Sequence, residues 1–157
     1  MQKLLSILLK IINTFRKIVW KIFKPVTFGV RVIIMKENSI LLVKHRYDDF
    51  WYLPGGKIRK KEMEEVAAKR EILEECYISI TDFDGVLGRY KNSGEGKKDN
   101  ITVLITKHWE QNKSKQNIEI EKARFFEMKN LPENVSPATK RRINELLSGQ
   151  KETYRDW

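Results

Sequence analysis

This sequence has almost no cysteine, no acidic residue near its N-terminus and no long uncharged stretch. Its 157 residues include a single cysteine, Cys76, so an intramolecular disulfide is excluded and a cysteine-based metal cluster is not expected. A chain without disulfides fits a reducing, cytoplasmic compartment. Lysines interrupt the N-terminal apolar residues before they reach the length of about 20 residues that a transmembrane helix needs. The sequence therefore argues against a disulfide-stabilised scaffold and against a membrane-spanning protein.

The positive charge of the chain is concentrated at its N-terminus. The formal net charge is +10, yet no acidic residue precedes Glu37, and residues 1–36 hold eight lysines and arginines. The remaining 121 residues carry 23 basic and 21 acidic side chains, which nearly cancel. We therefore expect no nucleic-acid partner for the domain as a whole, whereas a basic tail that meets an anionic surface is expected.

Residues 1–24 have the pattern of a long basic amphipathic helix, with no glycine or proline before Pro25. At 100° per residue, apolar side chains gather on one side: Leu4, Leu8, Ile11, Phe15, Ile18 and Ile22. Lysines gather on the opposite arc: Lys3, Lys10, Lys17, Lys21 and Lys24. The pattern predicts a helix lying in the plane of an anionic membrane, at its inner face, with each lysine contributing about 1 kcal/mol.

Two other interpretations of residues 1–24 stay open. The helix could pack on its own domain or on a second subunit, which would give a homodimer, or it could be a basic targeting peptide. A cleaved secretory signal is argued against, because Lys10 interrupts the apolar core and no small-residue cleavage site follows.

The body of the chain alternates between strand and helix patterns. Strands are predicted where β-branched residues cluster or alternate with polar ones, and the first two should pair as a hairpin. The predicted strands cover 26–35, 38–46, 85–91, 101–109 and 118–128. Helices are predicted over 61–76 and 136–147, the second with Ser136 as N-cap and Gly149 as its stop. This order predicts an α+β fold, a mixed β-sheet sandwiched by helices.

Carboxylates cluster on the first of these helices. Glu71, Glu74 and Glu75 are spaced i, i+3 and i+4, so their side chains project from one face and repel one another. A divalent cation would reverse the sign of that interaction, and Mg²⁺ prefers carboxylates, water and phosphate oxygens as ligands. The Gly55–Gly56 turn would let a backbone carbonyl approach the same ion. A solvated acidic helix face is the alternative.

The full spacing around these residues resembles the Nudix box, G-x5-E-x7-R-E-U-x-E-E-x-G-U, in which U is aliphatic. The positions that match are Gly56, Glu62, Arg70, Glu71, Ile72, Glu74, Glu75 and Ile78. Two positions depart: Tyr77 stands where the box has its last glycine, and Lys61 stands where many relatives have glycine before the first glutamate. A bulky residue in a left-handed helix stop costs roughly 1 kcal/mol or more.

The resemblance implies a Nudix fold over a domain from 25 to 149, followed by a polar tail at 150–157. It also implies hydrolysis of a nucleoside diphosphate linked to another moiety, with Mg²⁺, or alternatively Mn²⁺, as cofactor. Carried over by position, Glu71, Glu74 and Glu75 would bind the metal together with the Gly55 carbonyl. Gly56 would be structural.

The resemblance further implies that Glu62 and Arg70 hold the loop and the helix in register. The general base is one of the three ligand carboxylates or a carboxylate near the last strand, Glu119 or Glu121, with Glu119 preferred.

The sequence is least informative about the substrate. A small nucleotide-diphosphate compound is expected, and His45, Arg46 and Lys57 are candidate phosphate contacts. Two other functions stay open: a catalytically inactive nucleotide-binding module that docks on a partner through its N-terminal helix, and a pyrophosphatase that acts on RNA ends and binds RNA through the basic tail.

Overall fold

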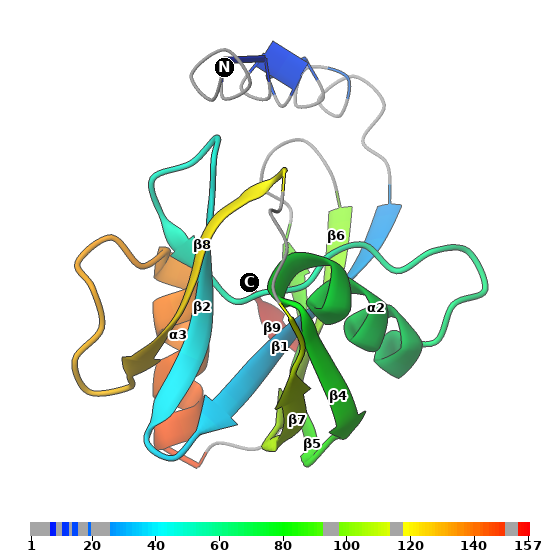
Figure 1. The fold of residues 1–157 in the computed structure, drawn as a ribbon. Coiled ribbons are helices and arrows are strands. Elements are labelled where there is room, and N and C mark those ends of the chain that lie inside the picture. Colours follow the sequence, from blue (N-terminus) through cyan, green and yellow to red (C-terminus); the bar gives the residue numbers. More distant parts are fainter. Residues whose placement is uncertain are drawn as a thin grey trace.

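The computed structural model describes residues 7, 8, 11, 12, 14, 15, 19, 26–92, 98–113, 118–149 and 154–157. The strands are β1 (Val26–Lys36), β2 (Ser39–His45), β3 (Trp51–Tyr52), β4 (Ile78–Asp82), β5 (Gly85–Asn92), β6 (Lys98–Thr106), β7 (His108–Gln111), β8 (Ile120–Glu127) and β9 (Tyr154–Asp156). The helices of the domain are α2 (Glu64–Cys76) and α3 (Pro137–Leu147) (Figure 1).

The main sheet is mixed, as the sequence predicts. Its strand order is β3-β2-β1-β6-β5-β9, and β8 pairs with β2. The predicted β1–β2 hairpin forms, but its ladder contains only Met35–Ile40 and Lys36–Ser39. Beyond that point β1 runs parallel to β6, whereas β2 turns to β3 and β8. The two strands therefore separate, which opens the sheet beside β1.

The segment after β3 fills this opening. The amide of Val30 donates to the Gly56 carbonyl at 2.9 Å, and the amide of Val32 donates to the Pro54 carbonyl at 3.0 Å. These bonds satisfy the β1 amides that β2 leaves behind. They also fix the Gly55–Gly56 turn against the middle of the sheet.

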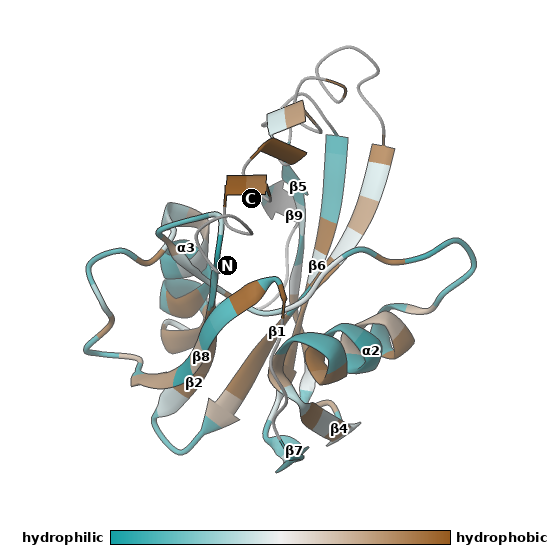
Figure 2. Ribbon diagram, turned by 45° about the horizontal axis from the view of Figure 1, so that its top comes forward, coloured by the Kyte–Doolittle hydropathy of each residue, from teal (hydrophilic) through white to brown (hydrophobic). Residues whose placement is uncertain are grey.

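Two apolar cores lie on opposite faces of the sheet, because side chains alternate along each strand. On one face Val30, Val32 and Ile34 of β1 pack with Ala67 and Ile72 of α2. On the other face Ile33 packs in a cluster that includes Ile143 of α3. In Figure 2 the middle of β1 is hydrophobic, whereas α2 is largely hydrophilic on its outer surface. The predicted sandwich of helices around a mixed sheet is confirmed.

The helix predicted to begin at Lys61 begins instead at Glu64. Lys61 has a φ of 66°, in the left-handed region, so it cannot continue a right-handed helix. Residues 59–62 form a turn in which the Glu62 amide donates to the Arg59 carbonyl at 3.1 Å and the Glu62 carboxylate accepts from the Arg59 amide at 2.8 Å. The charged pattern alone does not reveal this turn.

The strand predicted over 101–109 is two strands in the structure. Thr106 ends β6, and its hydroxyl oxygen accepts from the His108 amide at 2.9 Å while donating to the Asp82 carbonyl at 2.7 Å. These side-chain bonds turn the chain out of the main sheet. The following residues form β7, which pairs with β4, a strand that the sequence analysis did not predict.

The C-terminal helix has the predicted ends. The hydroxyl of Ser136 accepts the amide of Thr139, and Gly149 has a φ of 66°. Beyond it, β9 pairs with β5, and the buried Arg142 guanidinium stacks 3.9 Å from the centre of the Tyr90 ring and 5.4 Å from that of Trp157. Part of the predicted polar tail is thus attached to the sheet.

Most of the helix predicted over 1–24 lies outside the described residues. The seven described positions in that range have helical backbone conformation. Five of them are apolar and 53–69% exposed: Ile7, Leu8, Ile11, Ile12 and Phe15. Within the described part of the chain, no helix is long and apolar enough to span a bilayer.

Replacing Lys61 with glycine should stabilise the domain. Its side chain is exposed and its φ is 66°, a conformation that costs a residue with a Cβ roughly 1 kcal/mol relative to glycine. The free energy of unfolding from urea titration should rise by up to about 1 kcal/mol, less the entropy that glycine adds to the unfolded chain. Lys60→Gly, at an exposed neighbour without positive φ, should lower it; a gain of equal size in both variants would contradict the explanation.

Candidate active site

Both glycines of the turn before α2 are required by close contacts. Gly55 has a φ of 128°, and a Cβ there would lie 2.4 Å from the Val30 carbonyl oxygen. A Cβ at Gly56 would lie 2.3 Å from Oε2 of Glu71. Such distances are shorter than real contacts, so a side chain at Gly55 would push the turn away from β1, and one at Gly56 would displace the Glu71 carboxylate. The turn therefore presents bare backbone to the Glu71 carboxylate.

A charged hydrogen-bond network connects this turn to α2. Arg70 donates from Nε and Nη2 to the two oxygens of Glu62, both at 2.8 Å, and from Nη2 to the Lys57 carbonyl at 3.0 Å. The same guanidinium donates from Nη1 to Glu71 at 2.6 Å. The Arg70 hydrogen bond, reinforced by the Arg59 amide, lowers the pKa of Glu62 to about 2. The Arg70 guanidinium thus connects α2 to the loop that carries Lys57 and Glu62.

Glu75, unlike Glu62, is a carboxyl group whose pKa is raised. Its Oε2 accepts the Gly55 amide at 2.9 Å. Burial raises the pKa of this carboxyl to about 7, against the effects of the Gly55 hydrogen bond and of the Arg31 charge. The negative charges of Glu71 and Glu119 add to the rise. The ionised form of Glu75 is therefore disfavoured mainly because the group is removed from solvent.

A cavity of about 310 Å³ brings these groups together. Four carboxylates line it: Glu71 and Glu75 on α2, Asp99 on β6 and Glu119 just before β8. Arg31 and Lys57 supply positive charge to the same cavity. It is thus a polar pocket lined by both acidic and basic side chains.

The opposite part of this cavity is built from strand ends. Thr27 and Phe28 of β1 and Asp99 of β6 line it, and the Thr27 hydroxyl donates to the Asp99 carboxylate at 2.7 Å. Phe28 is an aromatic residue with 55% of its surface exposed. This part can hold a moiety with both a flat or apolar face and hydrogen-bonding groups.

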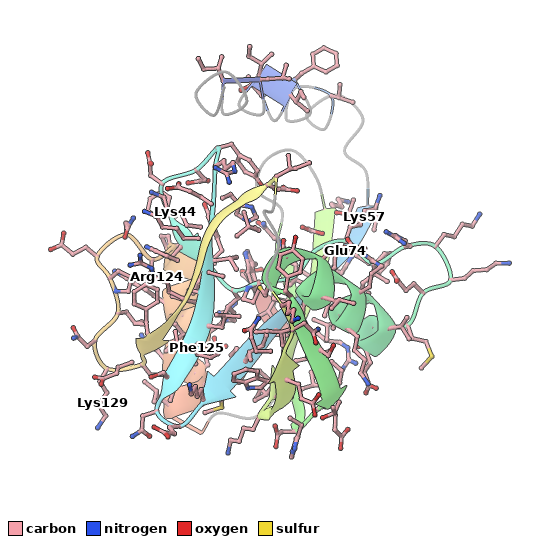
Figure 3. The ribbon with its side chains drawn as sticks, in the orientation of Figure 1. Lys44, Lys57, Glu74, Arg124, Phe125 and Lys129 are labelled. Carbon is pink, nitrogen blue, oxygen red and sulfur yellow. The ribbon has the colours of Figure 1, made fainter. Side chains whose placement is uncertain are left out.

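The Gly55 carbonyl, predicted as a metal ligand, accepts a hydrogen bond from Nη1 of Arg31. Glu74, predicted as another ligand, is 55% exposed and lies 3.8 Å from the guanidinium nitrogens of both Arg59 and Arg70. Lys57 and Glu74 are labelled near the upper end of the domain in Figure 3. Within the described ranges no three acidic, histidine or cysteine side chains already converge as metal ligands do.

The donor chemistry nevertheless fits a hard divalent cation. The acidic groups offer only oxygen, and burial makes the ionised form of Glu75 costly unless a cation joins it. Arg31 supplies part of that positive charge in this conformation. The Gly55 carbonyl oxygen has a second lone pair, so its bond to Arg31 does not by itself exclude a cation from that oxygen.

Glu119 and Glu121 lie in different places. Glu119 accepts the Tyr47 hydroxyl at 3.0 Å, and its Oε1 is 3.9 Å from Nδ1 of His45, within the cavity that contains Glu75. Glu121 instead lines a second cavity and pairs with Lys122 at 3.5 Å. Of the two candidate bases, only Glu119 lines the cavity that Glu71 and Glu75 also line.

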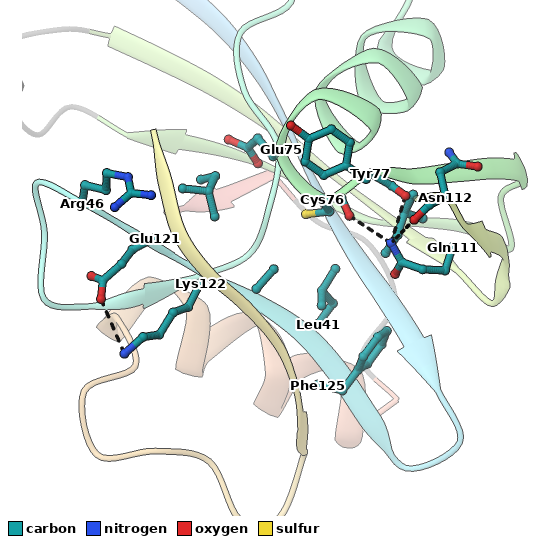
Figure 4. Close-up of a pocket in the computed structure, with 13 residues that line it drawn as sticks. Leu41, Arg46, Glu75, Cys76, Tyr77, Gln111, Asn112, Glu121, Lys122 and Phe125 are labelled. Atoms are coloured by element: carbon teal, nitrogen blue, oxygen red, sulfur yellow. Dashed lines mark hydrogen bonds and ion pairs between the residues drawn. The ribbon is translucent and has the colours of Figure 1, made fainter. Parts of the chain in front are cut away.

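The second cavity, of about 470 Å³, lies between β2, β8 and the end of α2 (Figure 4). Arg46 lines this second cavity, whereas His45 and Lys57, the other two candidate phosphate contacts, line the first. Of the carboxylates that line the first cavity, Glu75 alone also reaches this one. The larger volume is therefore the poorer candidate for chemistry on a diphosphate.

Sequence reasoning missed four residues that line the first cavity: Arg31, Phe28, Tyr47 and Asp99. Arg31 had a readable signal, since it is a charged residue inside an otherwise apolar strand. Asp99 had none, because its place follows from the parallel pairing of β1 with β6, in which it stands opposite Thr27.

Comparison with known proteins identifies the domain. The model of the NUDIX domain matches residues 25–147. A Bacillus subtilis protein, provisionally named 8-oxo-dGTP diphosphatase, is 50% identical over 50 residues, which are 31% of this chain and 34% of that protein. The RNA pyrophosphohydrolase of Hydrogenovibrio crunogenus is 34% identical over 77 residues, 49% of this chain and 42% of that protein. The matched regions thus span well under half of these curated relatives.

A solved structure shows the same fold. The MutT NUDIX hydrolase from Burkholderia pseudomallei has a TM-score of 0.69 over 77% of this chain and 98% of its own, at 24% identity. Because the family model covers most of the residues and includes both the glycine turn and the acidic helix, this chain belongs to the Nudix hydrolase family.

Proposed function

We propose that this chain is a Mg²⁺-dependent pyrophosphohydrolase that cleaves the diphosphate bond of a nucleoside diphosphate linked to another moiety. Mn²⁺ is the alternative ion. The observation that carries the proposal is the convergence of Glu71, Glu75 and Glu119 on one cavity that Arg31 and Lys57 also line. This combination suits a substrate whose reacting part is a phosphate chain.

The cation, when bound, supplies neutralisation of phosphoryl charge and acidifies a coordinated water. Glu71 and Glu75 would hold the cation. Glu74 would become a third ligand if its carboxylate moved away from Arg59 and Arg70. Arg70 keeps Glu71 in place through its bond at 2.6 Å, and Glu62 in turn fixes Arg70.

The proton of the attacking water would pass to Glu119. Its carboxylate is 56% exposed and is held by the Tyr47 hydroxyl, so solvent can remove the proton after each turnover. Lys57, His45 and Arg31 would orient the phosphate chain from the facing walls of the cavity. The half of the cavity near Phe28 and Asp99 would then receive the base or the second moiety.

The alternative of an inactive module rests on the two departures from the Nudix box. In the structure Tyr77 adopts φ 54° and ψ 39°, and its amide donates to the Leu73 carbonyl as a helix stop would. The helix therefore ends where the box requires, with Glu75 still facing the turn. This placement supports catalysis over a degenerate site. The homodimer, the exclusion of nucleic acid and the placement at a membrane remain predictions.

A panel of nucleoside diphosphate derivatives and nucleoside triphosphates tests the proposal. With Mg²⁺ we expect at least one compound to give nucleoside monophosphate together with the phosphorylated second moiety, or with pyrophosphate in the case of a triphosphate. No product is expected when a chelator removes the metal. The names of the relatives make 8-oxo-dGTP and a 5′-triphosphorylated RNA the first compounds to include. Tight nucleotide binding without cleavage of any compound would favour the inactive module.

A further inference from the structure

Several strands begin at the same end of the domain, where the cavity with the acidic residues reaches the surface. β1 and β6 are parallel and paired from Val26–Lys98 onward, and Ile120 at the start of β8 pairs with His45 at the end of β2. In Figure 1 the first residues of β1, β6 and β8 lie at the upper end of the domain. Phe28 and Glu119 are both at this end and both line the cavity. We call this end the rim.

The rim exposes apolar side chains that no part of the described domain covers. Val26 is 59%, Phe28 55% and Ile118 68% exposed. Single exposed apolar residues are ordinary, but here Phe28 lines the polar cavity, and Val26 and Ile118 directly precede Thr27 and Glu119, which also line it. The cavity can therefore receive a molecule whose diphosphate goes inward while an apolar part stays at the rim.

The basic N-terminal segment enters the domain at this rim, since β1 begins at Val26. Its described apolar residues at 7, 8, 11, 12 and 15 are spaced as one face of a helix, and each is more than half exposed. Residues 1–24 carry six lysines and arginines and no acidic residue. An apolar face bordered by cations complements an anionic lipid surface, in which tails meet the apolar side chains and headgroups meet the lysines.

We propose that the N-terminal segment and the rim lie together on an anionic bilayer, and that the substrate is a diphosphate with an apolar tail, taken up from that bilayer. This inference rests on the proposed diphosphate hydrolysis for its substrate but not for the membrane contact. A second copy of the chain is the competing occupant of the apolar face. A protein partner would need acidic groups to match six cations, whereas anionic lipid supplies them without a specific sequence.

Vesicle flotation tests the membrane contact. The full chain should float with phosphatidylglycerol-containing vesicles, should stay in solution with phosphatidylcholine alone, and should be released by high salt. Ile11→Asp with Phe15→Asp should lower the floated fraction at least about ten-fold, and Ile118→Ser several-fold. Met63→Ser is the matched control, because Met63 is 70% exposed but lies outside the cavity lining, and it should float as the wild type does.

The substrate is tested with two probes that share one bond. The wild type should hydrolyse a nucleoside diphosphate diacylglycerol in anionic vesicles at least about ten-fold faster than the soluble nucleoside diphosphate glycerol. The Ile11→Asp/Phe15→Asp variant should lose this difference in rate. It should still cleave the soluble compound at the wild-type rate.

Three results would overturn the inference: no flotation of the wild type, equal flotation of wild type and double variant, or an apolar face buried in a lipid-independent dimer by sedimentation. If flotation fails while soluble compounds are cleaved, this inference falls alone. If flotation succeeds but no diphosphate is cleaved, the proposed hydrolysis and the tailed substrate fall while the membrane contact stands.

Discussion

Glu75→Gln is expected to lower Mg²⁺-dependent hydrolysis by about 10³-fold. Glutamine has nearly the same shape and can still accept the Gly55 amide, but it removes the negative charge that faces the cavity. Losing one preorganised electrostatic group in a site of this kind costs about 10²–10³ in kcat, and loss of the metal adds to it. The measurement is initial rate with the best compound of the panel, together with Mn²⁺ uptake by titration.

The matched control is Glu65→Gln, the same chemical change on the same helix. Glu65 is exposed and does not line the cavity, so both rate and metal uptake should stay within about two-fold of wild type. A Glu75→Gln protein that is folded and retains wild-type rate and Mn²⁺ uptake would remove Glu75 from the site. Equal losses of rate and metal uptake in both variants would instead show that metal binding depends on the total negative charge of α2 and not on Glu75 in particular.

The local part of this site could be predicted because it is encoded in one stretch of sequence. Gly55 to Glu75 spans a turn and a helix, and the spacing of Glu71, Glu74 and Glu75 is fixed by helical periodicity. Such contacts join residues close in the chain, so a pattern reveals them. The two departures, Lys61 and Tyr77, were also readable: both positions have positive φ in the structure, which is why glycine is usual there.

The parts that could not be predicted depend on pairing between distant strands. Arg31 reaches the Gly55 carbonyl because β2 leaves β1 after two residue pairs and the turn takes its place. Asp99 reaches the cavity because β6 joins β1 in parallel. Local periodicity reports which face of a strand is apolar, but it carries no information on which strand is the neighbour.

The difference between local and long-range contacts also explains why some strands were predicted wrongly or missed. The strand over 101–109 reads as continuous because Lys107 alone does not break an apolar pattern, yet the Thr106 hydroxyl ends it by bonding to Asp82, which is 24 residues away. β9 was missed because three polar or aromatic residues carry no strand period, and their conformation follows from the edge that β5 offers. Tertiary contacts decide short elements of this kind.

Removing the metal should make the stability of the domain fall as the pH rises through the acidic and neutral range. Burial raises the pKa of Glu75 to about 7 from 4.5. The folded state then binds the proton more tightly than the unfolded state does. The stabilising contribution of protonated Glu75 to the free energy of unfolding is complete below about pH 4.5 and is lost as the pH rises to about 7 and above. The loss in unfolding free energy is at most about 3 kcal/mol, and less where solvent reaches the carboxylate.

Mg²⁺ should reverse this loss, because it binds the ionised carboxylate that the fold otherwise penalises. In thermal unfolding, saturating Mg²⁺ should therefore raise Tm more at about pH 8 than at about pH 5.5, relative to chelator at the same pH. In Glu75→Gln the metal-free protein should lose most of its pH dependence between these values, and Mg²⁺ should shift Tm little at either. An equal Mg²⁺ shift at both pH values in the wild type would show that Glu75 is ionised without a cation, and would place the metal elsewhere.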